Sequence, residues 1–218
     1  LVHGLLNIVF AKGGLPAQTS LMTGRAVFTN AYAFIPKGCF SDIVVSYLPH
    51  WRETRLWLIA RPMSGFSETF SQYVMEVTPG GGSTNPDAEA GSEHVLFVTE
   101  GQLTLTIDGA SHDLTAGGYA FIPPHTAWTL LAVGHEPARF HWVRKLYEPV
   151  AGIAIPPAFV TNERSTPLNT MPDTNGVWGT TRFVDPTDVR DDMHVNIVTF
   201  QPGGVIPFEE THVMEHGL

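Results

Sequence analysis

A carboxylate and two imidazoles lie close together near the end of the 218-residue sequence. They belong to Glu210, His212 and His216, and they follow an alternating apolar segment and a Pro-Gly-Gly turn at residues 202–204. A carboxylate with two histidines is a common ligand set for a divalent transition metal that keeps open positions for substrate. Side chains at i and i+2 of a strand point to one side. Glu210 and His212 are therefore expected to converge inside a β-barrel, with His216 returning from the next turn.

The elements that position this cluster are expected to be β-strands. The 21 glycines and 17 prolines separate short segments rich in Val, Ile, Phe, Tyr and Thr, which is typical of an all-β protein. The segments expected to form strands are residues 25–35, 43–47, 56–60, 70–77, 95–98, 103–107, 119–122, 126–133, 140–146, 177–184 and 193–200. Their roughly even spacing predicts a sandwich or barrel.

Composition excludes several classes of partner. The formal charge is −9, with only 12 Lys and Arg residues and no basic cluster, which argues against nucleic acid. No apolar run is long enough to span a membrane. Residues 1–10 are apolar but lack a basic start and a small-residue cleavage site, so we interpret them as a packing segment and not a signal peptide. The single cysteine, Cys39, fits a reducing compartment such as the bacterial cytoplasm.

The sequence contains an internal repeat. Residues 72–81 align with residues 195–204, 123 positions later, and each copy ends in Pro-Gly-Gly followed by an acidic stretch. The same offset places Asp87, Glu89 and Glu93 opposite the carboxylate and the two histidines. These three carboxylates either form a solvated acidic loop or hold a cation. The repeat predicts two similar units.

In the second copy, Gly204 is followed after five residues by Glu210, after one more residue by His212 and after three more by His216. This spacing of a glycine and three candidate ligands resembles the first motif of the cupin superfamily. In the first copy, the residues from Glu93 to Gly101 resemble the end of that motif, and residues 118–124 resemble the second motif. Trp128 stands where that second motif places a histidine ligand. The resemblance implies two tandem cupin barrels, and it implies that the first has no working metal site.

The order Glu, His, His in the second copy, with a degenerate first cupin, resembles the bicupin (S)-ureidoglycine aminohydrolases, some of which are known as glyoxylate-induced proteins. The resemblance implies a homo-oligomeric manganese enzyme of allantoin breakdown that releases ammonia from a small ureido-amino acid. It assigns the metal to Glu210, His212 and His216, with a glutamine of the second motif as fourth ligand. Trp128 follows His94 by 34 residues, so the fourth ligand is expected near position 250, beyond this sequence. We therefore expect weak metal binding and little activity from this chain alone.

The expected organisation has four parts. Residues 1–40 form an N-terminal extension, and residues 41–148 form the first cupin. The Pro-rich residues 149–176 connect it to residues 177–218, the start of a second cupin that is incomplete in this chain. The half-built second barrel is expected to expose strand edges, which favours association.

Several alternatives remain for the chemistry. Fe²⁺ or Zn²⁺ suits the same ligands, and two histidines with one carboxylate also describe an iron dioxygenase. A third possibility is a bicupin that only binds a small ligand. The string from His212 to His216 also fits H-x-x-E-H, which requires a helix in zinc peptidases. Glu215 is a candidate base or partner of a ligand, although a solvated carboxylate is the simpler interpretation, and Glu209 competes with Glu210 for the metal.

Overall fold

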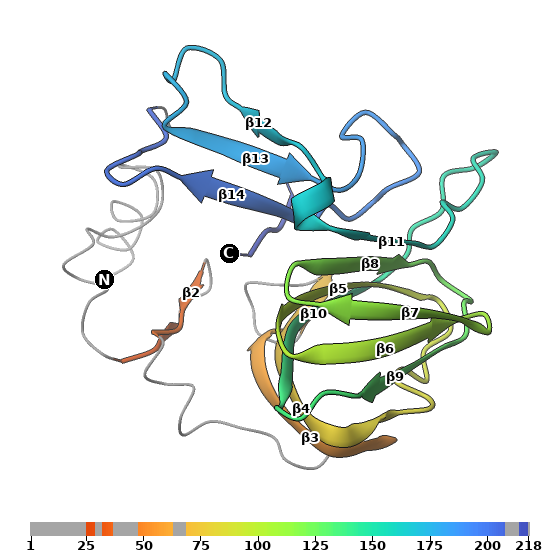
Figure 1. Ribbon diagram of the computed structural model, residues 1–218. Coiled ribbons are helices and arrows are strands. Elements are labelled where there is room, and N and C mark those ends of the chain that lie inside the picture. The colour runs from red at the N-terminus through yellow and green to blue at the C-terminus, as the bar shows by residue number, and fades with distance from the viewer. Residues whose placement is uncertain (1–24, 29–31, 37–47, 63–68, 208–213, 218) are drawn as a thin grey trace, which may run out of the picture.

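The computed structural model describes residues 25–28, 32–36, 48–62, 69–207 and 214–217 (Figure 1). Strands dominate these residues, with one 3₁₀ helix, η3 (Glu163–Ser165), and no α-helix among them. The strands are β1 (Val27–Phe28), β2 (Ala33–Phe34), β3 (Trp51–Ala60), β4 (Phe70–Ser83), β5 (Ser92–Glu100), β6 (Gln102–Ile107), β7 (Ala110–Thr115), β8 (Gly118–Ile122), β9 (Trp128–Ala132), β10 (Ala138–Leu146), β11 (Phe159–Asn162), β12 (Leu168–Thr170), β13 (Trp178–Arg182) and β14 (Asn196–Phe200).

Nine strands form one antiparallel sheet in the order β11-β8-β5-β10-β4-β9-β6-β7, with β3 paired to β4. The sheet curls into a nearly closed barrel, which confirms the predicted all-β fold (Figure 1). Asp108 and Gly109 turn β6 into β7 with positive φ angles of 46° and 84°, as expected of a tight hairpin. Glu76 on β4 links three neighbouring strands, since it accepts hydrogen bonds from Arg55 of β3 and Arg139 of β10.

The barrel has an apolar core inside and a second apolar layer outside. Inside lie aliphatic and aromatic side chains from all sides, such as Leu96 on β5. On the outer face, Val95 and Phe97 of the same strand pack against residues 183–195 of the second unit. This covering explains why β5 is buried on both faces, whereas the hairpin β6–β7 alternates between buried and exposed positions.

The second unit contains the sheet β12-β13-β14 and repeats one feature of the first. β13 pairs antiparallel with β14 as β3 pairs with β4. Pro-Gly-Gly lies within β4, at a register shift in its pairing with β3, and it follows the end of β14 in the second unit. Gly80 and Gly203 have φ angles of 78° and 79°. A Cβ atom on Gly81 or Gly204 would lie 2.9 Å from the carbonyl oxygen three residues earlier, that of Thr78 or Gln201. The internal repeat predicted from the sequence is therefore confirmed in the backbone.

Residues 149–176, which were expected to connect the two units, contain the two strands β11 and β12. Within 149–176, β11 pairs with β8 and extends the barrel sheet, whereas β12 pairs with β13. Residues 163–167 then join the two sheets. The strand expected at 25–35 is instead two short paired strands, β1 and β2. The segments 1–10 and 43–47 lie outside the described residues, as does Cys39.

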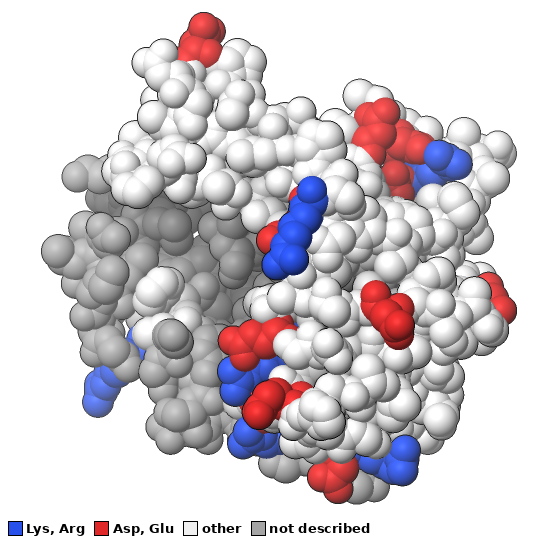
Figure 2. Space-filling view, in the orientation of Figure 1, with Lys and Arg blue, Asp and Glu red and all other residues white. Residues whose placement is uncertain are grey.

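In the part of the chain that the structure describes, no helix is long and apolar enough to cross a membrane. On the face shown in Figure 2, Lys and Arg side chains lie beside Asp and Glu side chains, and the coloured residues form no extended basic patch. Arg139 forms ion pairs with both Glu76 and Glu100.

Candidate functional site

The predicted metal cluster lies at the edge of the described structure. Glu210, Glu209 and His212 lie outside the described residues, so the structure does not place them. His216 is exposed, and its Nδ1 lies 3.0 Å from the carbonyl oxygen of Met214. A carbonyl oxygen only accepts hydrogen bonds, so Nδ1 is the donor in this pair.

Glu215 is held by a neighbouring segment. Its Oε2 accepts hydrogen bonds from the backbone N–H of Thr69 at 2.9 Å and from its Oγ1 at 2.7 Å. These bonds bring the end of the chain against the residue that precedes β4. Residues 214–217 are not helical, which disfavours the zinc-peptidase interpretation of the H-x-x-E-H string.

The corresponding positions of the first barrel show how the repeated motif is arranged. Asp87 and His94 approach each other at the barrel mouth, with 3.9 Å between Oδ2 and Nε2. The ring of Trp128 lies 5.3 Å from that of His94. Trp142 donates its indole N–H to His94 Nδ1 at 3.3 Å. The motif positions of a carboxylate, a histidine and the fourth-ligand site thus converge in space.

The positively charged guanidinium group of Arg144 lies beside Asp87 at the mouth of the first barrel. Its Nε lies 3.0 Å from Oδ2 of Asp87, and its Nη2 donates to Glu89 and to Ser92. Burial, followed by the positive charge of Arg144, lowers the pKa of His94 to about 3. The histidine is therefore neutral at ordinary pH, and both carboxylates are paired with a guanidinium. Among the described residues, no group of three or more His, Cys, Asp and Glu side chains is arranged to hold a metal ion.

The three-carboxylate cation site considered from the sequence is not formed. Asp87 and Glu89 meet Arg144 at the mouth, whereas Glu93 lies on the outer face of β5 beside Asp192 of the second unit. His94, one residue later, faces the barrel interior, because neighbouring residues of a strand point to opposite faces. The 123-residue offset therefore fails at the third ligand, where the first copy has one extra residue in the loop.

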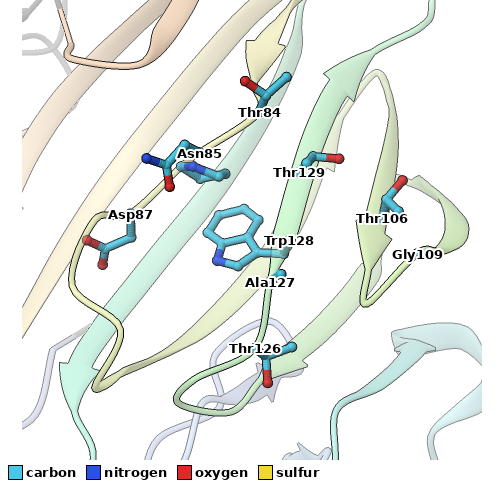
Figure 3. Close-up of a pocket in the computed structure, with 10 residues that line it drawn as sticks. Thr84, Asn85, Asp87, Thr106, Gly109, Thr126, Ala127, Trp128 and Thr129 are labelled. Carbon is cyan, nitrogen blue, oxygen red and sulfur yellow. The ribbon is translucent and has the colours of Figure 1, made fainter.

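A cavity of about 340 Å³ opens beside Trp128. Figure 3 shows the indole between the loop that carries Asn85 and Asp87 and the strands that carry Thr106 and Thr129. The indole is only 6% exposed and fills the place where a metal-binding cupin has its fourth ligand. In the first barrel, Trp128 thus takes the position that the cupin resemblance assigns to a metal-binding histidine.

An antiparallel barrel whose ligand-motif positions converge at its mouth defines a cupin-type protein. In agreement, the cupin domain family matches residues 73–144. The chain is similar to the glyoxylate-induced protein of Pseudomonas aeruginosa, with 56% identity, a TM-score of 0.81, and coverage of 93% of this chain and 73% of that one. It is 27% identical over 202 residues to the (S)-ureidoglycine aminohydrolase of Escherichia coli, covering 92% of this chain and 74% of that protein.

A plant relative adds to this comparison. The (S)-ureidoglycine aminohydrolase of Arabidopsis thaliana is 29% identical over 195 residues, which are 89% of this chain and 61% of the plant protein. The chain thus spans between about three fifths and three quarters of its relatives' lengths. We conclude that the chain belongs to the (S)-ureidoglycine aminohydrolase family of the cupin superfamily, as its sequence motifs predict.

Two functional features of the first barrel were missed in the sequence. Arg144 is 55 residues from its partner Glu89, so no local spacing connects them. His94 was not assigned a role of its own, although it lies in the run from Glu93 to Gly101 that resembles the end of the cupin motif. Four tryptophans, Trp51, Trp57, Trp128 and Trp142, were expected in the core or at an interface; Trp57 is only partly buried, and the other three are buried.

Proposed function

We propose that the protein acts as an (S)-ureidoglycine aminohydrolase, which converts (S)-ureidoglycine and water to (S)-ureidoglycolate and ammonia, with the fourth metal ligand and full activity not expected of residues 1–218 alone. The observation that carries this proposal is that relatives bearing this name align with about nine tenths of the chain. The Glu-x-His-x₃-His string lies within the same chain and supplies a ligand set for the metal that the family resemblance implies.

In this proposal Glu210, His212 and His216 hold the metal, which is Mn²⁺, with Fe²⁺ or Zn²⁺ as alternatives. The described part of the site fits that role. Nδ1 of His216 lies within hydrogen-bond distance of a backbone carbonyl, and such a bond to the ring is usual for metal-binding histidines. The internal repeat supports Glu210 as the carboxylate ligand. The matching residue of the first barrel, Asp87, approaches His94 at the barrel mouth.

When bound, the ion supplies Lewis-acid polarisation and holds the substrate. The protein's own contribution is to fix the ligands. Glu215 keeps its carboxylate on Thr69, so we propose that it positions the segment carrying His216. A role of Glu215 as general base remains a proposal that requires those two hydrogen bonds to be released.

The test measures ammonia release from (S)-ureidoglycine and the metal content of the purified protein with Mn²⁺, Fe²⁺ or Zn²⁺. His216→Ala is expected to lower both, whereas His194→Ala, which alters an exposed histidine of the second unit, is expected to change neither. Glu210→Gln and Glu209→Gln differ by one position and decide which carboxylate binds. Oxygen uptake with iron would support a dioxygenase, and a site that binds no metal would support a non-catalytic bicupin.

We also propose that the protein forms homo-oligomers, as the family resemblance implies, and that it works in a reducing compartment such as the bacterial cytoplasm, as its single cysteine indicates. The substrate is a small molecule, and neither nucleic acid nor a membrane is expected to take part. Light scattering coupled to size-exclusion chromatography measures the oligomer directly. A monomer over the whole accessible concentration range would contradict the first proposal.

A further inference from the structure

Three residues of the first barrel stand at the ligand positions of the cupin motif that ends at Gly101. They are Asp87, Glu89 and His94, and their spacing matches that of the three candidate ligands of the second unit, apart from one extra residue before the third. Carboxylates and imidazoles are the side chains that bind divalent cations of the Mn, Fe and Zn type. The first barrel therefore keeps a metal-capable residue at each of these positions.

A guanidinium group already lies among these side chains. Arg144 of β10 is paired in register with His94 of β5, and both lie on the inner face of the barrel. Its Nε lies 3.0 Å from Oδ2 of Asp87, and its Nη2 donates to Glu89 and to Ser92. The side chain of Asp87 is only 7% exposed, so this ion pair is shielded from water. The two carboxylates are thus neutralised by a fixed cation of the protein itself.

The imidazole of His94 is held in a form that does not offer Nε2 to a metal ion. An indole N–H only donates, so Nδ1 of His94 accepts the 3.3 Å hydrogen bond from Trp142. Burial, followed by the charge of Arg144, lowers the pKa of His94, so the ring is neutral and carries its hydrogen on Nε2. Metal binding through Nε2 would require that hydrogen to move to Nδ1, where it would meet the indole N–H.

We propose that Arg144 takes the place of a metal ion in the first barrel, and that its removal uncovers a divalent-cation site formed by Asp87, Glu89 and His94. A cavity of about 420 Å³ is lined by both Asp87 and Arg144, which gives an ion and its waters a route to the carboxylates. Oδ2 of Asp87 is buried and accepts no hydrogen bond from a described residue, so its electron pairs are available to an ion. The proposal concerns the first barrel and does not depend on the aminohydrolase activity proposed for the protein.

The test uses the full chain with His216→Ala, which removes a candidate ligand of the second unit, as the parent protein. Mn²⁺ is the probe, and its binding is followed by calorimetry and by thermal unfolding. Arg144→Ala is expected to bind Mn²⁺ at least tenfold more tightly than the parent and to gain thermal stability when Mn²⁺ is added, because the ion binds only the folded state. Arg144→Lys keeps a cation at this place, and Arg164→Ala removes an equal charge from the exposed η3, so neither is expected to gain affinity.

Further changes locate the ion. Asp87→Asn, added to Arg144→Ala, is expected to abolish the gained binding, whereas Trp142→Phe is expected to tighten it, since His94 can then carry its hydrogen on Nδ1. Nitrogen NMR of the wild-type protein, which needs no variant to fold, is expected to show the hydrogen of His94 on Nε2. An Arg144→Ala protein that Mn²⁺ neither binds nor stabilises would overturn the proposal. A hydrogen on Nδ1 of His94 in the wild-type protein would overturn the role of Trp142.

Discussion

At the scale of single residues, Glu93 is an acid buried between the barrel and the second unit. It is 0% exposed and lies beside the carboxylate of Asp192. Burial, together with the neighbouring carboxylate of Asp192, raises the pKa of Glu93 well above its ordinary value of 4.5. Glu93 is therefore protonated at neutral pH in the folded protein and ionised in the unfolded chain.

This difference predicts that Glu93→Gln stabilises the protein. Because the folded pKa is raised, the wild-type fold loses stability as pH rises above the unfolded pKa, by at most about 1.4 kcal/mol per pH unit. Glutamine does not ionise, and its amide can donate to Asp192. The variant's advantage in the free energy of unfolding, measured with urea, is thus expected to be small near pH 5 and larger at pH 8.

Glu136→Gln is the matched control, since Glu136 is exposed in a loop on the barrel. It is expected to change the free energy of unfolding by less than about 0.5 kcal/mol at every pH. If Glu93→Gln destabilised the protein equally at pH 5 and pH 8, Glu93 would be ionised and paired in the fold, contrary to our account.

The contrast between Glu93 and His94 also shows the limit of sequence reasoning about the site. The repeat aligned Glu93 with His216 because the strands before both loops match. In the structure, Glu93 lies on the outer face of β5 with Val95, and His94 takes the inner position with Leu96. A single-residue slip inverts every side chain of a strand, and an ungapped offset cannot reveal it.

At the scale of elements, the repeated turn requires glycine in both copies. Gly80 and Gly203 have positive φ but open space where a side-chain methyl group would lie, whereas a Cβ at Gly81 or Gly204 would lie within 3.0 Å of backbone oxygens. Backbone oxygens on two neighbouring segments cannot move away as a flexible side chain can. The second glycine of each turn is therefore the more restricted one.

Alanine substitutions test this ranking. Gly80→Ala and Gly203→Ala are expected to cost about 1–2 kcal/mol, the usual penalty of a left-handed backbone for alanine. Gly81→Ala and Gly204→Ala are expected to cost more, because the backbone must also shift. Urea unfolding of the four variants gives the comparison within each turn. Equal costs at both positions of a turn would show that the close contacts relax without penalty.

Strand positions were largely predictable from the sequence, but their pairing was not. Alternation and turn residues located β5, β6, β8, β9 and β10 to within a few residues, whereas β4 continues beyond the expected end at residue 77 and β7 was not among the expected strands. Which strands are neighbours depends on contacts far apart in the chain, such as β10 lying between β5 and β4. The Pro-rich residues after 148 gave no alternating pattern, and β11 and β12 were missed because each is short and paired at an edge.

At the scale of the whole molecule, the second unit packs on the outside of the first barrel. The ring of Phe183 stacks on Tyr119 with 3.9 Å between ring centroids, and it also lies 6.4 Å from the ring of Phe97. An ion pair between Lys145 and Asp192 lies at the same contact. Apolar contact is expected to provide most of the stabilisation, because partly exposed ion pairs contribute little.

Phe183→Ala is therefore expected to loosen the second unit without unfolding the barrel. The ring is half-buried, so the cost is expected to be about 1–3 kcal/mol, below that of a core phenylalanine. Hydrogen exchange is expected to speed up in β13 and β14 and to stay slow in β6 and β9, which lie away from this contact. Phe200→Ala, which removes a ring stacked on Trp178 within the second sheet, is the control and should leave exchange in β8 unchanged. Equally faster exchange in β6 and β9 of Phe183→Ala would show that the two units unfold together.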